Sequence, residues 1–403
     1  MSRDVADVVV VGGGLVGAAC AFELAGRGLA VTVVDRHDAG RATDAGAGIL
    51  SPETMGGLPE SFLDLADLAG AHHRALGPEL AGLGAPDPAY ASCGALRVAV
   101  REGDDDIYAV NVAASTARHP GVLEPLDPDA ARAAFPPLGP VRAAVWNPRG
   151  ARVDGRALTA ALVHGARARG TEWRRGDVAG VRTAGGRVLG VDTAAGPLAA
   201  GTVVVAGGAW TPAVAADLGL RAGVRPVRGQ IVHLGLPADT AGWPVLQPIL
   251  SHYVVAWPGG RVALGATVED AGFDARVTAG GLAGLLAEGV RVSPGLADAT
   301  VLETRVGLRP VSDDDLPIVG PVPEADGVVV ATGLGANGLL LGPVTGRLVA
   351  DLVTGAPPPL DLASFAPARL GPTGAGRPDR AGTGRGVGGL APGSEEATSC
   401  PSP

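Results

Sequence analysis

The sequence contains no lysine, because all 32 of its basic residues are arginines. This absence excludes a lysine Schiff base, a pyridoxal-phosphate lysine and the lysine of a Walker phosphate loop. Coding bias in a GC-rich gene is the simpler explanation for the missing lysines. The chemical exclusion holds in either case.

Cysteines are few and scattered, at Cys20, Cys93 and Cys400. They form no CxxC pair and no Cys–His spacing typical of zinc, and their odd number suits no disulfide framework, so we expect a reducing compartment and no metal site. The first residues show no basic leader, apolar signal core or cleavage site. Charged residues interrupt the apolar run of residues 8–34, which argues against a membrane span. We therefore expect a cytoplasmic protein.

Aromatic residues make up only 3% of the chain, and the net charge is −9. Without a basic stripe the chain has no means of releasing counterions from phosphates, so no nucleic acid or anionic membrane is expected as a partner. Hydrophobic residues reach 46%, and many of the 64 glycines lie inside apolar runs, which is typical of a closely packed α/β protein. At 403 residues the chain exceeds a single core, so two domains are expected.

A nucleotide-binding pattern opens the chain as "VVVVGGGLVGAACAFELAGRGLAVTVVDR". It predicts a strand, a glycine turn, a helix over about residues 15–28 and a second strand ending at Asp35. Gly12 permits the tight turn, Gly14 lets the backbone approach a pyrophosphate, and Gly17 lets the helix lie close to the sheet. The helix N-terminus favours phosphate, and Asp35 can accept hydrogen bonds from ribose hydroxyls. The complete series predicts a bound dinucleotide.

A second glycine loop near the end of the chain, "ATGLGANGLLLGPVTGRLVADL", follows another apolar strand. We expect the helix behind it around residues 343–352, with Pro343 in its first turn. Its positive end can stabilise the negative charge of a reduced flavin, whereas NAD alone would not require this loop. An ordinary strand-to-helix turn is the alternative for these glycines taken alone.

Further motifs occur in a characteristic order: "GRATDAGAGILSPE", "GTVVVAGGAW", "PVRGQ", "YVVAWPGGRVALGAT" and "GLRPVSDDDLPIVG". Together with the two glycine loops, they resemble the D-amino-acid oxidase superfamily of flavoproteins, and within it the glycine oxidase and D-amino-acid dehydrogenase branch. The likeness covers about residues 4–365. It implies an α/β fold in which an FAD-binding Rossmann-like domain of the glutathione-reductase type is interleaved with an antiparallel β-rich substrate domain.

The resemblance, together with the pattern of expected strands, helices and loops, divides the chain into discontinuous domains. Residues 1–85, 146–223 and 305–365 are assigned to the FAD-binding domain, and residues 86–145 and 224–304 to the substrate domain. Within residues 94–148 we expect short strands and a small helix near residues 127–134. The adjacent His72 and His73 are interpreted as solvated residues of a helix over about residues 61–83. Residues 366–403 lack apolar periodicity and are expected to be disordered.

The resemblance also implies which residues contact FAD. Val178 would contribute backbone contacts to the adenine, and small residues from Ala42 to Gly48 would let the backbone pass a flat ring. Covalent attachment is not expected, because the cysteine used by monomeric sarcosine oxidases is absent near Gly307 and Leu308. The complete set of expected cofactor contacts is Gly12, Gly14, Leu15, Val16, Gly17, Asp35, Arg36, Ala42, Thr43, Ala47, Gly48, Ile49, Val178, Gly207, Trp210, Arg309, Gly333, Leu334, Gly335, Ala336, Asn337, Gly338 and Leu339.

Arg309 in "GLRP" matches the arginine that binds the substrate carboxylate in glycine-oxidase-like members, and Tyr253 matches the substrate tyrosine. A guanidinium binds a carboxylate through two parallel hydrogen bonds. The alternative for Arg309 is a salt bridge to Asp313, Asp314 or Asp315. Two cations of the relatives are missing, since Ala336 stands in place of a second arginine and a sarcosine-oxidase lysine falls near Leu340. Leu334 replaces a family histidine, so we expect a less cationic pocket and a larger or less anionic amine than glycine.

These features predict an FAD-dependent oxidase or dehydrogenase of an amino acid or amine. Hydride transfer from the carbon bearing the amine to the flavin would give an imine that hydrolyses. Dioxygen or a quinone would reoxidise the flavin, and a homo-oligomer is left open. The alternatives are a dehydrogenase of a secondary or N-methyl amine that passes electrons to a quinone or other carrier, a catalytically silent FAD-binding protein, and an NAD-dependent dehydrogenase.

Overall fold

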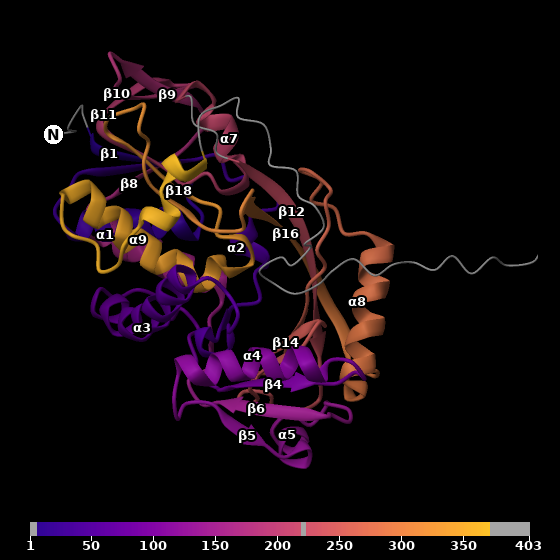
Figure 1. The fold of residues 1–403 in the computed structure, drawn as a ribbon. Coiled ribbons are helices and arrows are strands. Elements are labelled where there is room, and N and C mark those ends of the chain that lie inside the picture. The colour runs from indigo at the N-terminus through magenta and orange to yellow at the C-terminus, as the bar shows by residue number, and fades with distance from the viewer. Residues whose placement is uncertain (1–5, 219–222, 371–403) are drawn as a thin grey trace, which may run out of the picture.

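The computed structural model describes residues 6–218 and 223–370, which form two lobes, each built around a sheet (Figure 1). The upper lobe in this view contains both ends of the described chain. The lower lobe contains the middle of the chain, and the long strands β12 and β16 run from one lobe to the other. This is the expected α/β architecture of a Rossmann-like domain joined to a β-rich domain.

The first sheet has a parallel centre, because β8, β2, β1, β11 and β18 all pair in parallel and β17 adds an antiparallel edge. β9 and β10 extend β11 as a meander. Four of the six residues of strand β1 are valine and five of the six are buried, as is typical of a parallel strand covered on both faces. The strand bounds are β17 Ile318–Pro321, β18 Val328–Thr332, β11 Gly196–Val205, β1 Ala6–Val11, β2 Val31–Asp35, β8 Glu172–Arg175, β9 Val178–Ala184 and β10 Arg187–Thr193.

Four helices cover one face of this sheet and share its larger core cluster. They are α1 (Leu15–Gly26), α3 (Glu60–Gly82), α6 (Gly155–Ala168) and α9 (Gly338–Thr354). The contact between α1 and α9 depends on small residues, since a Cβ added at Gly346 would lie 2.4 Å from the carbonyl carbon of Ala19. This contact brings the N-termini of both helices to one region of the upper lobe.

The second sheet has the order β16-β12-β15-β14-β13-β4-β6-β5 and is antiparallel except where β13 meets β4. Its strands are β16 Thr300–Ser312, β12 Val224–Gly235, β15 Arg261–Gly265, β14 Tyr253–Trp257, β13 Val245–Pro248, β4 Ala95–Ala99, β6 Ala143–Asn147 and β5 Glu124–Leu126. Helices α5 (Pro128–Ala134) and α8 (Ala279–Val292) pack against it. Short elements complete the fold: α2 Ala42–Ala45, β3 Ile49–Leu50, β7 Ala151–Arg152 and α7 Thr211–Val214.

Helix α4 (Asp105–Arg118) was not predicted, because residues 94–148 were expected to contain only short strands and one small helix. Ser115 is the single fully buried residue of α4. Without an apolar stripe at helical spacing, its sequence gives no periodic signal. Its position nevertheless matters, since α4 places two of its residues, Ile107 and Asn111, in the cavity described below.

Two of the expected domain boundaries fall inside strands. The boundary at residues 145/146 lies within β6 and that at 304/305 within β16. Both strands belong to the second sheet, although Leu308 and Val311 of β16 also form single bridges to Arg41 and Leu334. We propose the same interleaved division with these boundaries moved to the ends of the two strands. The tail expected from residue 366 lies mostly outside the described residues, but its first part, Pro367–Leu370, is a 3-10 helix, so the prediction of disorder is wrong there.

Candidate active site

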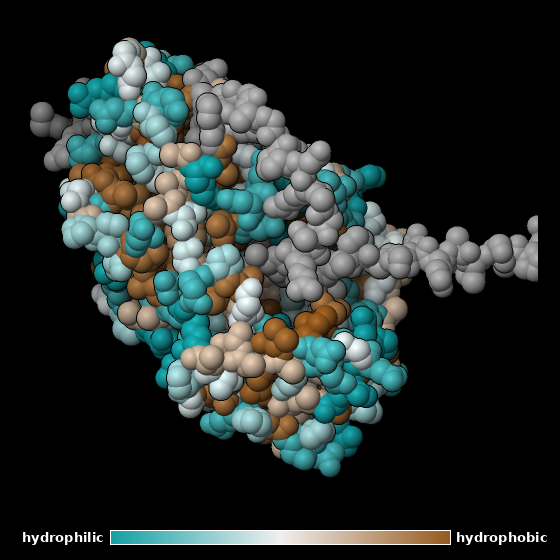
Figure 2. Space-filling model, in the orientation of Figure 1, coloured by the Kyte–Doolittle hydropathy of each residue, from teal (hydrophilic) through white to brown (hydrophobic). Residues whose placement is uncertain are grey.

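A cavity of about 1030 Å³ lies where the two lobes meet. Its walls come from the glycine turn after β1, the small-residue segment around α2, the substrate-side sheet and the loop before α9. On the face shown in Figure 2, apolar side chains gather between the lobes above α4. Exposed apolar residues at the cavity wall are Ile107, Leu250 and Val268.

The first glycine turn has the geometry that the pattern predicted. Gly12 has a φ of +102°, and a Cβ there would lie 2.5 Å from the carbonyl oxygen of Ala206. A Cβ at Gly17 would lie 1.9 Å from the carbonyl oxygen of Gly12, so α1 touches the turn directly. Gly14 and Leu15 then present the N-terminus of α1 to the cavity. Only residues without a Cβ permit this approach of helix, turn and neighbouring strand.

Polar groups surround the rim of this turn. The Leu15 amide donates a hydrogen bond of 3.1 Å to the Thr43 hydroxyl, which joins the small-residue segment to the start of α1. Asp35 accepts a 3.2 Å hydrogen bond from Arg41 and faces the cavity. Arg36 forms ion pairs with Asp38 at 2.8 Å and Asp177 at 3.0 Å.

Every residue expected to contact the cofactor lines this cavity except Gly17, which lies behind the turn. Val178, Gly207 and Trp210 line the cavity on the side of β11. The whole stretch from Gly333 to Leu339 also lines it. The structure therefore brings together segments that lie more than 300 residues apart in the sequence. Which atoms of a cofactor each residue touches stays a prediction.

The second helix begins earlier than expected, at Gly338, so Pro343 lies inside α9 rather than in its first turn. Proline has no amide hydrogen, and it leaves the carbonyl oxygen of Leu339 without its helical donor. His73 of α3 supplies that donor, with its Nε2 atom 3.0 Å from the oxygen of Leu339 and 3.0 Å from that of Leu340. Because a carbonyl only accepts, Nε2 carries the hydrogen.

The expectation that His72 and His73 are solvated was wrong. His73 is 4% exposed, and the side chain of His72 is 9% exposed and lies 3.7 Å from the Glu23 carboxylate. Burial lowers the pKa of His73 to about 4, and therefore the side chain is neutral at pH 7. Its partner Leu339 lines the cavity. His73 thus fixes the start of α9 from behind the site, a role that only the placement of α3 against α9 makes visible.

Arg309 lies on β16 and its side chain crosses Gly229 of β12. A Cβ at Gly229 would lie 2.4 Å from both terminal nitrogens of the guanidinium. Nη1 donates a 2.9 Å hydrogen bond to the carbonyl oxygen of Thr267 and a longer one of 3.5 Å to that of Arg228. Asp314, one of the alternative partners, forms its ion pair with Arg369 at 2.7 Å instead.

Tyr253 completes this part of the wall. The guanidinium of Arg309 and the phenol of Tyr253 lie near enough for each to influence the pKa of the other. Burial lowers the pKa of Arg309, while Tyr253 and Glu269 oppose that shift. Burial also raises the pKa of Tyr253, so the phenol stays neutral. The pair therefore presents a cation and a neutral hydroxyl to the same cavity.

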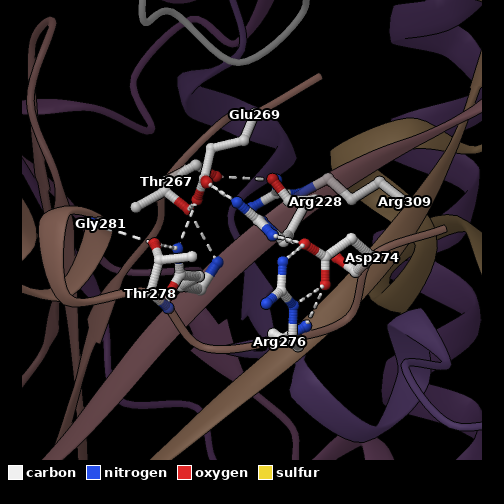
Figure 3. Close-up of polar contacts among 9 residues, drawn as sticks. Arg228, Thr267, Glu269, Asp274, Arg276, Thr278, Gly281 and Arg309 are labelled. Carbon is white, nitrogen blue, oxygen red and sulfur yellow. Dashed lines mark hydrogen bonds and ion pairs between the residues drawn. The ribbon is translucent and has the colours of Figure 1, made fainter. Parts of the chain in front are cut away.

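A network of polar side chains, most of them partly buried, fixes the loop that holds Arg309 (Figure 3). Arg228 is 7% exposed and pairs with Glu269 at 2.5 Å and with Asp274 at 3.0 Å. Glu269 also accepts hydrogen bonds from Gln230 at 2.6 Å and from Thr267 at 2.5 Å. Thr267 is thereby held where its carbonyl oxygen accepts from Arg309. The "PVRGQ" motif contributes Arg228 and Gln230 to this network, a role that the sequence did not reveal.

Several cavity residues were missed by sequence reasoning. Arg97 of β4 and Arg225 of β12 both line the cavity, so its wall is more cationic than expected from Ala336 and Leu334. The signal for Arg97 was present in the sequence, because an arginine interrupts the otherwise apolar strand "ALRVA". Uncharged polar residues of the wall that were also missed are Ser51, Thr54, Asn111, Gln247 and Ser251.

The cavity fits FAD on the evidence of its own residues. Gly12 and Gly17 create a cradle that Cβ atoms would fill, two helix N-termini reach the wall, and Asp35 lies one strand away from the turn. Anions are stabilised at such helix termini. No cysteine or histidine occurs among the described lining residues, so this part of the chain offers no thiol or imidazole for a covalent link. None of the described helices is both long and apolar enough to span a membrane.

Comparison with known proteins gives relatives over nearly the full chain. This chain is 36% identical to glycine oxidase of Pseudomonas putida, over 90% of this chain and 99% of the relative. The solved structure of iminodiacetate oxidase from Chelativorans sp. BNC1 matches with a TM-score of 0.85 and 38% identity, covering 89% of this chain and 98% of that one. Glycine oxidase of Geobacillus kaustophilus also matches with a TM-score of 0.85, at 31% identity, over 90% and 98% of the two chains.

The likeness to glycine oxidases confirms the resemblance read from the motifs, and the matching structures confirm the expected fold. A family model described as FAD dependent oxidoreductase (DAO) matches residues 7–352. The chain therefore belongs to the DAO family of FAD-dependent oxidoreductases.

Proposed function

We propose that this enzyme oxidises the C–N bond of an amino acid or related amine, with FAD held non-covalently. The observation that carries the proposal is the Arg309–Tyr253 pair, which offers a partly buried cation and a hydroxyl to the cavity that the N-termini of α1 and α9 also reach. When bound, FAD accepts a hydride from the carbon that bears the amine, and the resulting imine is hydrolysed. The glycine oxidase and iminodiacetate oxidase relatives support an amine that carries a carboxylate.

The chain's own residues act mainly by positioning. Arg309 and Tyr253 bind the carboxylate, and the Arg228–Glu269 network holds Arg309 through Thr267. Orientation of this kind supplies a large share of catalysis in reactions that need little acid–base chemistry. No histidine lies in the described cavity wall, and we expect the amine to arrive neutral or to release its proton to water. The rate is therefore expected to rise with pH as the substrate amine loses its proton.

Flavin bleaching under anaerobic conditions tests the proposal. The holoenzyme is mixed with a panel that contains glycine, sarcosine, iminodiacetate, proline and both enantiomers of alanine, and the visible flavin band is followed. Reduction by at least one amine is expected. If no member of a broad panel reduces the flavin, the protein binds FAD without oxidising amines. Repeating the reaction with dioxygen, and with a quinone under anaerobic conditions, identifies the electron acceptor.

A further inference from the structure

Arg97 is a cation of the cavity wall for which the described part of the chain supplies no counter-ion. It lies in the centre of β4, and its Nε atom is buried without a hydrogen-bond partner among the described residues. Tyr108 is the titratable group that acts on it, and burial raises the pKa of this phenol to about 12, so it is neutral at pH 7. No ion pair joins Arg97 to an acidic side chain in residues 6–218 and 223–370.

Strand register places Arg97 on the same face of the sheet as Tyr253. Arg97 pairs with Gln247, and the pairing of Leu246 with Val254 sets Gln247 opposite Tyr253. Directly paired residues point to the same face of a sheet. All three residues line the cavity, which agrees with that register. Two strand spacings, or about 9–10 Å, therefore separate the backbone at Arg97 from that at Tyr253.

Arg309 reaches Tyr253 from the opposite direction along the sheet. It lies on β16, at the far edge, whereas Arg97 lies on β4, beyond β13. The two guanidinium groups thus contribute to one cavity from the two sides of Tyr253. Asn111, Gln247 and Ser251 add uncharged polar groups to the Arg97 side.

Leaving a partly buried guanidinium such as that of Arg97 unpaired is unfavourable, because the charge loses part of its hydration and gains no anion. A bound anion removes this deficit at Arg97. The same holds at Arg309, whose hydrogen bonds go to two backbone carbonyls and which forms no ion pair with a carboxylate among residues 6–218 and 223–370. A ligand with one carboxylate satisfies one of the two cations, and a ligand with two satisfies both.

We propose that the substrate carries two anionic groups, of which Arg309 and Tyr253 bind the first and Arg97 binds the second. This inference rests on the proposed function, since it concerns the substrate of the same site. A dicarboxylic secondary amine or an acidic amino acid has the required chemistry. Arg97 then acts as a specificity residue.

A pair of ligands that cannot be oxidised as amines tests this assignment. Diglycolate and methoxyacetate share an ether oxygen and one carboxylate, and they differ in the second carboxylate. Binding of each to the FAD-loaded enzyme is followed by the change in the visible flavin spectrum. Diglycolate is expected to bind at least about tenfold more tightly, in line with one additional charge-assisted hydrogen-bonded contact.

Arg97→Met is expected to abolish this preference and to leave methoxyacetate binding within about twofold. Arg97→Lys keeps the charge and is expected to retain part of the preference. Arg132→Met is the matched control, because Arg132 is exposed on α5 outside the cavity and the variant loses the same charge. FAD content and the unfolding temperature of each variant are measured alongside, and Arg97→Gln serves if Arg97→Met does not fold.

Equal binding of the two ethers by the wild type overturns the inference. The inference is also overturned if the folded Arg97 variants lose affinity for both ligands by the same factor. That result is expected if Arg97 only stabilises the lobe. Failure of the proposed function is recognised separately, because the ether pair reports binding without oxidation. Iminodiacetate and sarcosine, which differ in the same way, then show whether the preference extends to flavin reduction.

Discussion

The Nε2 atom of His73 lies 3.0 Å from the carbonyl oxygen of Leu339, the acceptor that Pro343 deprives of its helical partner. A residue of α3 thereby completes the first turns of α9, and those turns form part of the cavity wall. The helix keeps a proline in its interior because a side chain from elsewhere in the fold replaces the missing amide.

His73→Phe is expected to lower the free energy of unfolding at pH 7 by about 1–3 kcal/mol, since a buried carbonyl loses its donor. FAD retention should fall as well, because the start of α9 loosens. Urea unfolding and FAD content measure the two effects. The exposed His164→Phe provides the control, and equal behaviour of both variants would contradict the positioning role of His73.

Stability should depend on pH in a defined direction. The folded-state pKa of His73 is about 4, below its value in the unfolded chain, so protonation favours unfolding. The contribution is complete above about pH 6.5 and is lost as the pH falls towards 4, by about 1.4 kcal/mol per pH unit. His233, whose pKa is also lowered to about 4, adds a loss of the same sign. Between pH 4 and 7 the free energy of unfolding, measured by urea titration at each pH, should therefore depend less steeply on pH in His73→Phe than in the wild type.

Gly229→Ala should displace Arg309 without removing it. The new Cβ would lie 2.4 Å from two guanidinium nitrogens, so the side chain has to leave its place over β12. We expect the KM for a carboxylate-bearing substrate to rise about 10- to 100-fold, as for the loss of a charge-assisted contact, with FAD content unchanged. Gly235→Ala on the same strand is the control, because its Cβ would meet the mobile end of Leu302 at 3.1 Å. Equal KM values in the two variants would argue against this position of Arg309.

Arg309→Met should weaken methoxyacetate binding by at least about tenfold, since the guanidinium–carboxylate contact is lost. Tyr253→Phe removes a neutral hydroxyl and should weaken methoxyacetate binding by about 3- to 10-fold. Spectral titration of the bound flavin measures both. If Arg309→Met loses FAD while its remaining holoenzyme binds the ligand normally, Arg309 belongs to the cofactor site and not to the substrate site.

Gly12→Ala should reduce FAD content strongly, because its φ of +102° and the oxygen of Ala206 at 2.5 Å both oppose a Cβ. Gly28→Ala separates these two causes. Gly28 has a φ of +83° but no atom within 4 Å of the added Cβ, so only backbone strain is introduced. FAD absorbance per chain and urea unfolding distinguish the variants. A similar FAD content in both would mean that the close approach at Gly12 does not shape the cofactor site.

The sequence by itself determined the parts of this protein whose signals are local. Glycine spacing, the valine strands and the terminal acid of β2 predicted the nucleotide-binding unit, because turn geometry and burial of a parallel strand depend on neighbouring residues. The order of the motifs predicted the family and the position of Arg309 near the cofactor. Helix α4 escaped prediction, since it buries too little to carry a periodic pattern.

Tertiary structure alone decided how distant residues combine. His73 meets Leu339 across 266 positions of the chain, and Arg97 shares a cavity with Arg309 because sheet order, not sequence, places β4 beyond Tyr253. Register between strands sets which side chains face the same space. A short turn fixes the register of a hairpin, but no such turn joins β4 to β13, so their pairing depends on the tertiary structure. The sequence shows each arginine, but only the packing of the strands places Arg97 and Arg309 in the wall of one cavity.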